Sequence, residues 1–333
     1  MEDVAREAGV SGQTVSRVVN ARGYIGAATR ERVEAAMHSL GYRPNSAARA
    51  LRSGRFRTIG VVMFSFSSYG NQRTLDAIAV RAAQLGYALT LIPVESSATE
   101  TVAGAFRRLE EHAVDGIIIV IEAHQLDEAD IEIPDALPVV FVDSNRGETH
   151  PFVDTDQAQG ARLATEHLLD LGHDTVWHIT GPARSYSAER RREAWRETLE
   201  KHERTVPAPI AGDWTAASGY AAGVELREIE GVTAVFAAND QMAIGVLRAF
   251  REVGREVPGD VSIVGFDGLP DAAQLWPPLT TVQQHPERVG ALAVDALLAE
   301  LEGAGSAAVD RPQTPLVGTE LIVRESTAPP RKR

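Results

Sequence analysis

Polar side chains follow several apolar runs in the body of the sequence, where they could hold a small molecule by hydrogen bonds. Asp143, Asn239 and Asp267 each come directly after such a run. Taken singly, residues of these types are common as helix caps and turn formers. Ligands of open α/β sheets bind at the carboxyl ends of the strands. Several polar residues at successive strand ends therefore favour one shared cleft.

An arginine and a tryptophan extend this set. Arg191 lies near the start of an expected helix, and its fork of N–H donors can bridge two ligand hydroxyls. Trp214 offers a flat apolar face that suits a sugar ring. The alternatives are an arginine on the surface, as expected for Arg190 and Arg192, and a tryptophan that only packs. Together with the strand-end residues, the pair favours a binding site.

A second group of hydrogen-bonding side chains lies near the N-terminus, on one face of a short expected helix. Val15, Val18 and Val19 recur at helical spacing, so the polar residues between them face the other way. Glutamine pairs well with adenine, arginine with guanine or phosphate, and serine or threonine with either. The polar face is predicted to read the base edges of DNA, and it consists of Gln13, Thr14, Ser16 and Arg17.

Three short helices are expected to position this face. An apolar stripe at 4–8 ends at Gly9, Ser11 is a good cap for the next helix, and a third stripe runs over 33–40 before Gly41. Two helices joined by a tight turn fit a helix-turn-helix, whose second helix enters the major groove. A purely structural bundle is the alternative. The polar face opposite the valines favours the DNA-binding interpretation.

The charge of the chain is divided in a way that fits this interpretation. The 333 residues carry a net charge of −13. Residues 1–57 hold ten arginines and five acidic residues, a net +5, so the remainder carries −18. A basic end on an acidic body is typical of nucleic-acid binding, although a solvated basic surface is the alternative.

From residue 58 onward, apolar runs alternate with helical patterns. Continuous apolar strands separated by helices indicate parallel sheets covered on both faces. Two such series predict an α/β core of two lobes. Strands are expected at 59–64, 88–94, 116–121, 139–142, 176–180, 234–237 and 262–266, and helices at 75–85, 106–112, 161–171, 189–202 and 220–228.

Composition argues against several other classes of protein. The chain has no cysteine, so neither disulfides nor cysteine metal sites are expected. The longest apolar stretch, 116–121, is far short of the ~20 residues that cross a bilayer. The first residues lack the pattern of a secretory signal, which predicts a cytoplasmic location and argues against a periplasmic carrier. Without a P-loop, a nucleophile elbow or a paired-histidine zinc motif, no catalytic residue, metal or cofactor is expected.

Several ordered motifs resemble those of the lactose-repressor (LacI/GalR) family of transcriptional regulators. The resemblance covers nearly the whole chain. It implies an N-terminal all-α helix-turn-helix domain followed by an α/β periplasmic-binding-protein-like core of two parallel-sheet lobes. The matching residues near the N-terminus are 3–11, 14–20, 29–30 with Val33, and 40–45 with Ala47, Ala48, Arg49 and Leu51.

The resemblance also assigns a hinge helix to the segment after Pro44, over 46–52 with Asn45 as its cap. In the family such helices pair across a dimer and wedge a leucine into the minor groove, and Leu51 matches that leucine. A plain linker is the alternative, and such a segment can fold only on DNA. The expected DNA-binding residues are Ser11, Gln13, Thr14, Ser16, Arg17, Asn20, Asn45, Arg49 and Leu51.

By the same resemblance, the inducer contacts of the family fall on Asp143, Ser187, Arg191, Trp214, Asn239, Asp267 and Gln284. One arginine among carboxylates, an asparagine and a tryptophan predicts a neutral saccharide as effector, with a β-galactoside as first choice. Departures at 64–66 and Val120 leave the sugar open. The alternatives are a purine or phosphorylated-sugar effector, and a sugar-binding protein without a regulatory role.

The sequence thus predicts a transcriptional repressor controlled by a small molecule. A C-terminal tail without a leucine-repeat helix predicts a homodimer, rather than a tetramer, on a pseudo-palindromic operator in double-stranded DNA. The expected domains are a helix-turn-helix at 1–44, a hinge at 45–57, a first lobe at 58–155 and 285–312, a second lobe at 156–284 and 313–326, and a tail at 327–333.

Overall fold

The computed structural model describes residues 1–19, 23–42, 54–63, 68–94, 99–111, 113–120, 137–143, 150–303 and 316–331. It divides into a helical unit, Met1–Phe56, and a larger core, Arg57–Arg333. Within the described residues, no helix is both long and apolar enough to cross a membrane. The predicted DNA-binding residues Asn20, Asn45, Arg49 and Leu51, and with them the expected hinge helix, lie outside the described residues.

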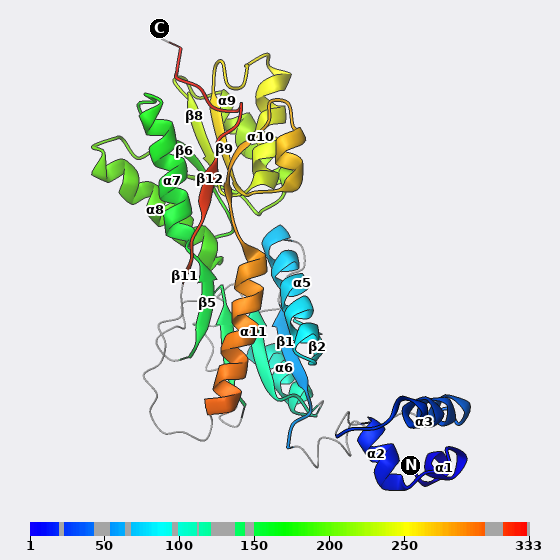
Figure 1. Ribbon diagram of the computed structural model, residues 1–333. Coiled ribbons are helices and arrows are strands. Elements are labelled where there is room, and N and C mark those ends of the chain that lie inside the picture. Colours follow the sequence, from blue (N-terminus) through cyan, green and yellow to red (C-terminus); the bar gives the residue numbers. More distant parts are fainter. Residues whose placement is uncertain are drawn as a thin grey trace. The chain divides into compact units, whose positions relative to one another are not determined.

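In its described residues, the helical unit holds three helices (Figure 1), which pack around a small apolar core. They are α1 (Glu2–Glu7), α2 (Gly12–Val19) and α3 (Ala27–Ser39). The turn after α1 passes through Gly9 at φ +62°, a conformation that glycine adopts without steric cost. Val15 and Val33 are fully buried at the centre of this core. The valine spacing therefore predicted the correct inner face of α2.

The first lobe of the core is a six-stranded sheet in the order β11-β5-β4-β3-β1-β2, with parallel neighbours. Alternate residues along each strand face opposite sides. Val61 packs with α5 and α11, and Val62 packs with α6 on the other face. The elements are β1 (Thr58–Met63), α5 (Tyr69–Gln84), β2 (Ala88–Pro93), α6 (Thr99–Glu111), β3 (Gly116–Val120), β4 (Val139–Val142), β5 (Phe152–Thr155), α11 (Pro286–Gly303) and β11 (Leu316–Val317).

The second lobe repeats this plan with the strand order β12-β10-β9-β8-β6-β7, in which β12 alone runs antiparallel to its neighbour. Val235 faces α9 and α10, whereas Phe236 faces α7 and α8. The elements are α7 (Gln157–Asp170), β6 (Trp177–Thr180), α8 (Tyr186–Lys201), β7 (Ile210–Ala211), α9 (Ala216–Arg227), β8 (Ala234–Ala237), α10 (Asp240–Glu252), β9 (Ser262–Asp267), the 3-10 helix η3 (Pro270–Gln274), β10 (Thr280–Gln283) and β12 (Glu320–Ile322).

The chain passes from one sheet to the other three times: between β5 and α7, between β10 and α11, and between β11 and β12 (Figure 1). The third passage differs from the predicted division, which placed 313–326 in the second lobe. Leu316 pairs with Asp154 and Val317 with Thr155 in the first sheet. The chain therefore crosses only after Val317. Gln159 of α7 holds this passage, because its Oε1 accepts a 2.7 Å hydrogen bond from the backbone N–H of Thr319.

Candidate functional site

A cavity lies where the carboxyl ends of the two sheets meet. Its walls come from both lobes, and the space at its centre is about 60 Å³. The structure brings all seven residues of the predicted effector site to this cavity. They are Asp143 after β4, Ser187 and Arg191 on α8, Trp214 before α9, Asn239 at the start of α10, Asp267 at the end of β9 and Gln284 after β10.

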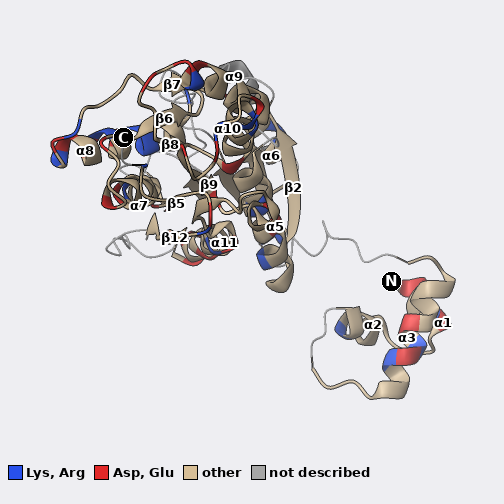
Figure 2. Ribbon diagram, turned by 90° about the horizontal axis from the view of Figure 1, so that it is seen from above, with Lys and Arg blue, Asp and Glu red and all other residues tan. Residues whose placement is uncertain are grey.

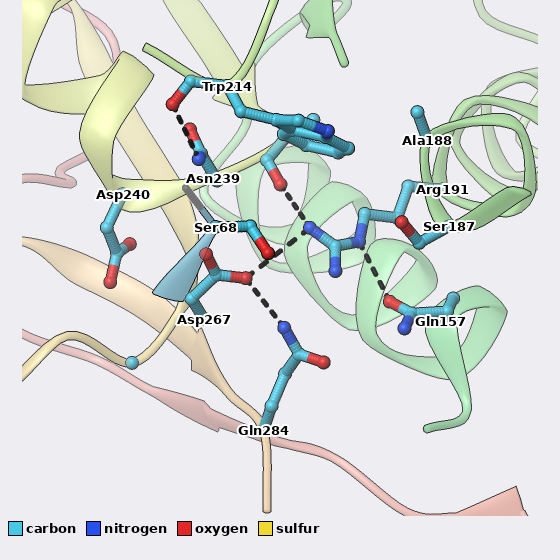
Figure 3. Close-up of polar contacts among 12 residues, drawn as sticks. Ser68, Gln157, Ser187, Ala188, Arg191, Trp214, Asn239, Asp240, Asp267 and Gln284 are labelled. Atoms are coloured by element: carbon cyan, nitrogen blue, oxygen red, sulfur yellow. Dashed lines mark hydrogen bonds and ion pairs between the residues drawn. The ribbon is translucent and has the colours of Figure 1, made fainter. Parts of the chain in front are cut away.

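Arg191 stands at the centre of the hydrogen-bond network (Figure 3). Its Nε donates to Gln157 Oε1 at 2.8 Å, and its Nη1 donates to the carbonyl oxygen of Ala238. Nη1 also lies 3.5 Å from Asp267 Oδ1. The guanidinium stacks on Phe266, with 3.7 Å between its carbon and the ring centroid, and lies 5.4 Å from the Trp214 ring centroid. The 4%-exposed side chain is thus fixed before any ligand arrives.

Asp267 carries the counter-charge to Arg191. Its Oδ1 accepts a 2.6 Å hydrogen bond from Gln284 Nε2, so three predicted site residues form one chain of contacts. Its backbone φ is +105°, a region that side chains rarely occupy and that is found where surrounding structure enforces it. Burial raises the pKa of Asp267 to about 6, although Arg191 and Gln284 act in the opposite direction. The donors Arg191 and Gln284 favour the charged form of this carboxyl.

Asn239 and Trp214 are held as a pair. Asn239 caps α10, since its Oδ1 accepts from the backbone N–H of Met242 at 2.8 Å, and its Nδ2 donates to the carbonyl oxygen of Trp214 at 3.0 Å. Trp214 sits at φ +74°, and its buried Nε1 has no hydrogen-bond partner within the described residues. Its ring lies against Gly181, where a Cβ would approach ring carbons to 2.3 Å. Only glycine at 181 leaves the ring in this place.

Ser187 has a mainly local contact in this structure. Its hydroxyl lies 3.1 Å from that of Ser185, which caps α8 by accepting from the backbone N–H of Ala188. The N–H groups of a first helical turn need acceptors outside the helix, and Ser185 supplies one of them at the start of α8. Ser187 in this turn lines the cavity.

Sequence reasoning missed several polar residues that line the cavity, among them Asp154 and Gln157. Asp154 lies near the end of β5, and Gln157 is the first residue of α7. The four-residue strand β5 was not recognised in the sequence, so the rule that sited the other strand-end residues could not be applied to it. Gln157 offers no pattern at all, since its partner Arg191 is 34 residues away.

One buried carboxylate beside the site is structural. Asp240 Oδ1 accepts from the Thr281 hydroxyl at 2.6 Å, and Oδ2 accepts from the backbone N–H of Leu269 at 2.7 Å. It joins α10 to the ends of β9 and β10 and does not line the cavity. Burial, with Asp267 nearby, raises the pKa of Asp240 to about 7.

The helical unit presents the predicted base-reading face on α2. Gln13 and Arg17 are exposed, and Thr14 and Ser16 are half-buried. Ser11 serves as the cap, because its Oγ accepts from the backbone N–H of Thr14 at 3.1 Å. Arg17 is the only charged residue of α2, whereas α1 and α3 carry acidic residues as well (Figure 2). Among the three helices, α2 is therefore the one without a negative charge.

A helix-turn-helix unit joined to a two-lobed α/β core with a polar cavity defines a DNA-binding regulator controlled by a small molecule. Residues 1–45 match the model for bacterial regulatory proteins of the lacI family, and residues 165–327 match the periplasmic binding protein-like domain. The chain belongs to the lacI family of transcriptional regulators, which are not enzymes.

Relatives of known structure and function extend this match over the whole chain. The lactose operon repressor of Escherichia coli is 37% identical over 334 residues, which cover 98% of this chain and 90% of that protein. The ribose operon repressor of Halalkalibacterium halodurans is 32% identical, with 98% of this chain and 96% of that protein covered. The lac repressor dimer bound to operator and the anti-inducer ONPF superimposes with a TM-score of 0.86 at 35% identity, covering 98% of both chains.

Proposed function

We propose that this repressor binds a pseudo-palindromic operator as a homodimer in the cytoplasm and that a neutral saccharide controls its affinity for DNA. A β-galactoside is our first choice of effector. The observation that carries the proposal is the composition of the cavity, where one buried arginine stands among carboxylates, carboxamides and an indole.

A sugar satisfies this set of groups because each hydroxyl both donates and accepts hydrogen bonds. Arg191 can donate to a hydroxyl oxygen while Asp267 accepts from a neighbouring hydroxyl. Trp214 supplies the flat apolar surface that a ring face prefers. A phosphate or carboxylate ligand meets repulsion instead, since Asp143, Asp154 and Asp267 line the same cavity and Arg191 is its only cationic lining residue in the described part of the chain.

The relatives support a saccharide more than another class. They include repressors named for lactose and ribose operons and a CelR–cellobiose complex, which is 31% identical with a TM-score of 0.70 and 98% of both chains covered. The purine repressor PurR of Haemophilus influenzae, at 29% identity, is also similar. The galactoside follows from the higher identity to the lactose operon repressor.

Entry of a saccharide requires movement. Ligand pockets have volumes of roughly 300–1,000 Å³, whereas the space at the centre of this cavity is about 60 Å³. The walls that belong to different lobes must separate, and the three chain passages are the only covalent connections between the lobes in the described residues. The proposal therefore requires the two lobes to change their relation when the effector enters.

Calorimetry with a panel of neutral mono- and disaccharides, phosphorylated sugars and purines tests the proposal. Wild-type protein is expected to bind a saccharide, a β-galactoside best, and Arg191→Ala to lose affinity by about 100-fold, because each lost hydrogen bond to a charged group contributes about 1.5–3 kcal/mol. Arg196→Ala is the matched control, since Arg196 lies on the same helix, half-exposed and paired with Glu200.

Two outcomes contradict the proposal in different ways. If only phosphorylated or purine ligands bind, the effector class is wrong. If Arg191→Ala binds the sugar as well as wild type and Arg196→Ala do, the cavity is not the effector site.

A further inference from the structure

We propose that Asp154 is an effector-recognition residue, and that its carboxylate accepts a hydrogen bond from a hydroxyl of the saccharide held at Arg191. The inference rests on the proposed function and adds to it a specificity-determining contact from the first lobe. Neither the spacing of polar residues nor the family resemblance pointed to this position.

The sheet register carries Asp154 to the cavity. β5 pairs with β4 so that Val153 is opposite Val142, which places Asp154 beside Asp143 at the carboxyl edge of the first sheet. On the other side of β5, Leu316 of β11 is opposite Asp154. Asp154 is 4% exposed and lines the cavity together with Arg191 and Asp267 of the second lobe.

Within the described residues, the contacts of Asp154 do not use its full capacity as an acceptor. Its Oδ1 accepts from the backbone N–H of Thr155 at 2.6 Å, and the nearby Gln157 side chain lowers the pKa of the carboxyl. A carboxylate offers about four acceptor positions. Asp240 differs, because both of its oxygens bind groups of the protein and neither faces the cavity. Of these two buried aspartates, Asp154 is the one placed to receive a ligand donor.

Gln157 joins Asp154 to the centre of the site. Its Oε1 accepts from Arg191 Nε, so its amide N–H groups remain available, and the side chain lowers the pKa of Asp154. The orientation of this carboxamide therefore fixes Arg191 on one side and affects the charge of Asp154 on the other. Gln157 acts as a positioning residue for the pair.

Burial without a full set of donors is unfavourable for a carboxylate. Desolvation raises the pKa of Asp154 to about 7, although Thr155, Arg191 and Gln157 lower it. A sugar hydroxyl that donates a hydrogen bond to the Asp154 carboxylate stabilises its charged form. Because Asp154 comes from the first sheet and Arg191 from the second lobe, a saccharide held by both residues connects the two lobes.

A ligand–protein cycle tests the inference with methyl β-D-galactopyranoside and its 2-, 3-, 4- and 6-deoxy analogues, measured by calorimetry on the full chain. With wild-type protein, we expect one deoxy analogue to bind 10- to 100-fold more weakly, because it lacks the hydroxyl that donates a hydrogen bond to Asp154. Asp154→Asn should weaken the parent sugar by a similar factor. In that variant, removal of the same hydroxyl should cost less than 3-fold.

Asp115→Asn is the matched control. Asp115 is a buried aspartate at the opposite, amino edge of the same sheet, where it accepts from the backbone N–H of Thr58 at 3.2 Å. This variant should keep the wild-type affinity for every analogue. Asp154→Ser is measured beside Asp154→Asn, with thermal unfolding and DNA binding as checks of folding.

The outcomes separate the two proposals. If the galactoside binds wild type and the deoxy effects are unchanged in both Asp154 variants, Asp154 is structural and the inference is wrong while the proposed function stands. If neither galactoside nor any other neutral saccharide of the panel binds wild type, both fail. If the Asp154 variants do not fold, equal binding of all deoxy analogues to wild type overturns the inference.

Discussion

The two lobes of the core share a sheet plan but present different halves of the site. The second lobe contributes a cross-linked cluster, in which Arg191, Asp267 and Gln284 touch one another, and Asn239 holds Trp214. The first lobe contributes Asp143 and Asp154 from neighbouring strand ends. The comparison indicates that the second lobe presents a preorganised cluster around Arg191, whereas the first lobe adds two carboxylates to the cavity.

The largest expected effect comes from breaking the cluster of the second lobe. Asp267→Ala removes the counter-charge of a buried arginine, a change that typically costs about 3–5 kcal/mol. We expect saccharide affinity to fall more than 100-fold and the melting temperature to fall with it. Asp271→Ala, an exposed aspartate on η3, should change neither.

Removal of a cavity carboxylate from the first lobe should have a different effect. Asp143→Ala is expected to weaken saccharide binding with a smaller loss of thermal stability, because Asp267 is the carboxylate that lies 3.5 Å from Arg191 Nη1. Equal losses of stability in Asp143→Ala and Asp267→Ala would show that both halves are equally preorganised.

The helical unit provides a reference outside both lobes. Gln13→Ala and Arg17→Ala should each weaken a specific duplex, found by selection from random sequences, by about 1–3 kcal/mol, or roughly 5- to 150-fold. Binding to random DNA should change less, and saccharide affinity should stay at the wild-type value. Equal losses on specific and random duplexes would instead assign these side chains to phosphate contacts.

A smaller effect is expected from displacing the Trp214 ring in the second lobe. In Gly181→Ala, the new Cβ would lie 2.3 Å from the Trp214 ring, so the ring must shift. We expect about 10-fold weaker binding of the saccharide, in keeping with ~1–1.5 kcal/mol for a displaced aromatic contact. Gly104→Ala is the control, because the nearest atom to its Cβ would be 3.8 Å away. Unchanged binding in Gly181→Ala would exclude ring stacking.

The smallest expected effect is a dependence on pH. Burial raises the pKa of Asp267 to about 6 and that of Asp154 to about 7. Ligand hydroxyls donate to the charged carboxylates, so saccharide affinity should rise a few-fold from pH 5 to pH 8. The charged or titratable neighbours of Asp154 are Arg191 and Tyr186 on α8, Asp143 after β4 and Asp156 before α7.

Two measurements check the assignment of this pH dependence. Calorimetry on Asp154→Asn should lose the upper part of the rise, near pH 7. Thermal unfolding of the ligand-free core should show stability falling as the pH rises from about 4 through 7, because a carboxyl with a raised pKa in the folded state binds its proton more tightly there than in the unfolded chain. Affinity that is flat from pH 5 to pH 8 contradicts the role of both carboxyls.

The elements that the sequence predicted share a strong local signal. The valine spacing of α2 and the continuous apolar runs of β1, β3 and β9 need no tertiary information. The helices α10 and α11 were missed, although their residues have clear buried faces in the structure. The polar start of α10 was read only as a site. Short edge strands such as β7 and β11, two residues each, carry no periodicity to detect.

The sequence predicted which residues form the site but not how they contact one another. The strand-end rule and the family motifs pointed to the individual residues. The pairing of Arg191 with Gln157 depends on two helices that meet only in the folded core. The sequence gives no sign of the left-handed backbone at Asp143, Trp214 and Asp267, because residues other than glycine rarely adopt it. Tertiary packing imposes both features.

The late position of β11 and α11 in the chain has a consequence for biosynthesis. The first lobe needs residues up to Val317 to complete its sheet, whereas the core of the helical unit lies within the first 42 residues. The 291 residues that follow residue 42 emerge in about 15–60 s at typical rates of synthesis, and domains generally fold in the order in which they are made. Each new copy therefore has its DNA-reading unit before it has a sensor for its effector.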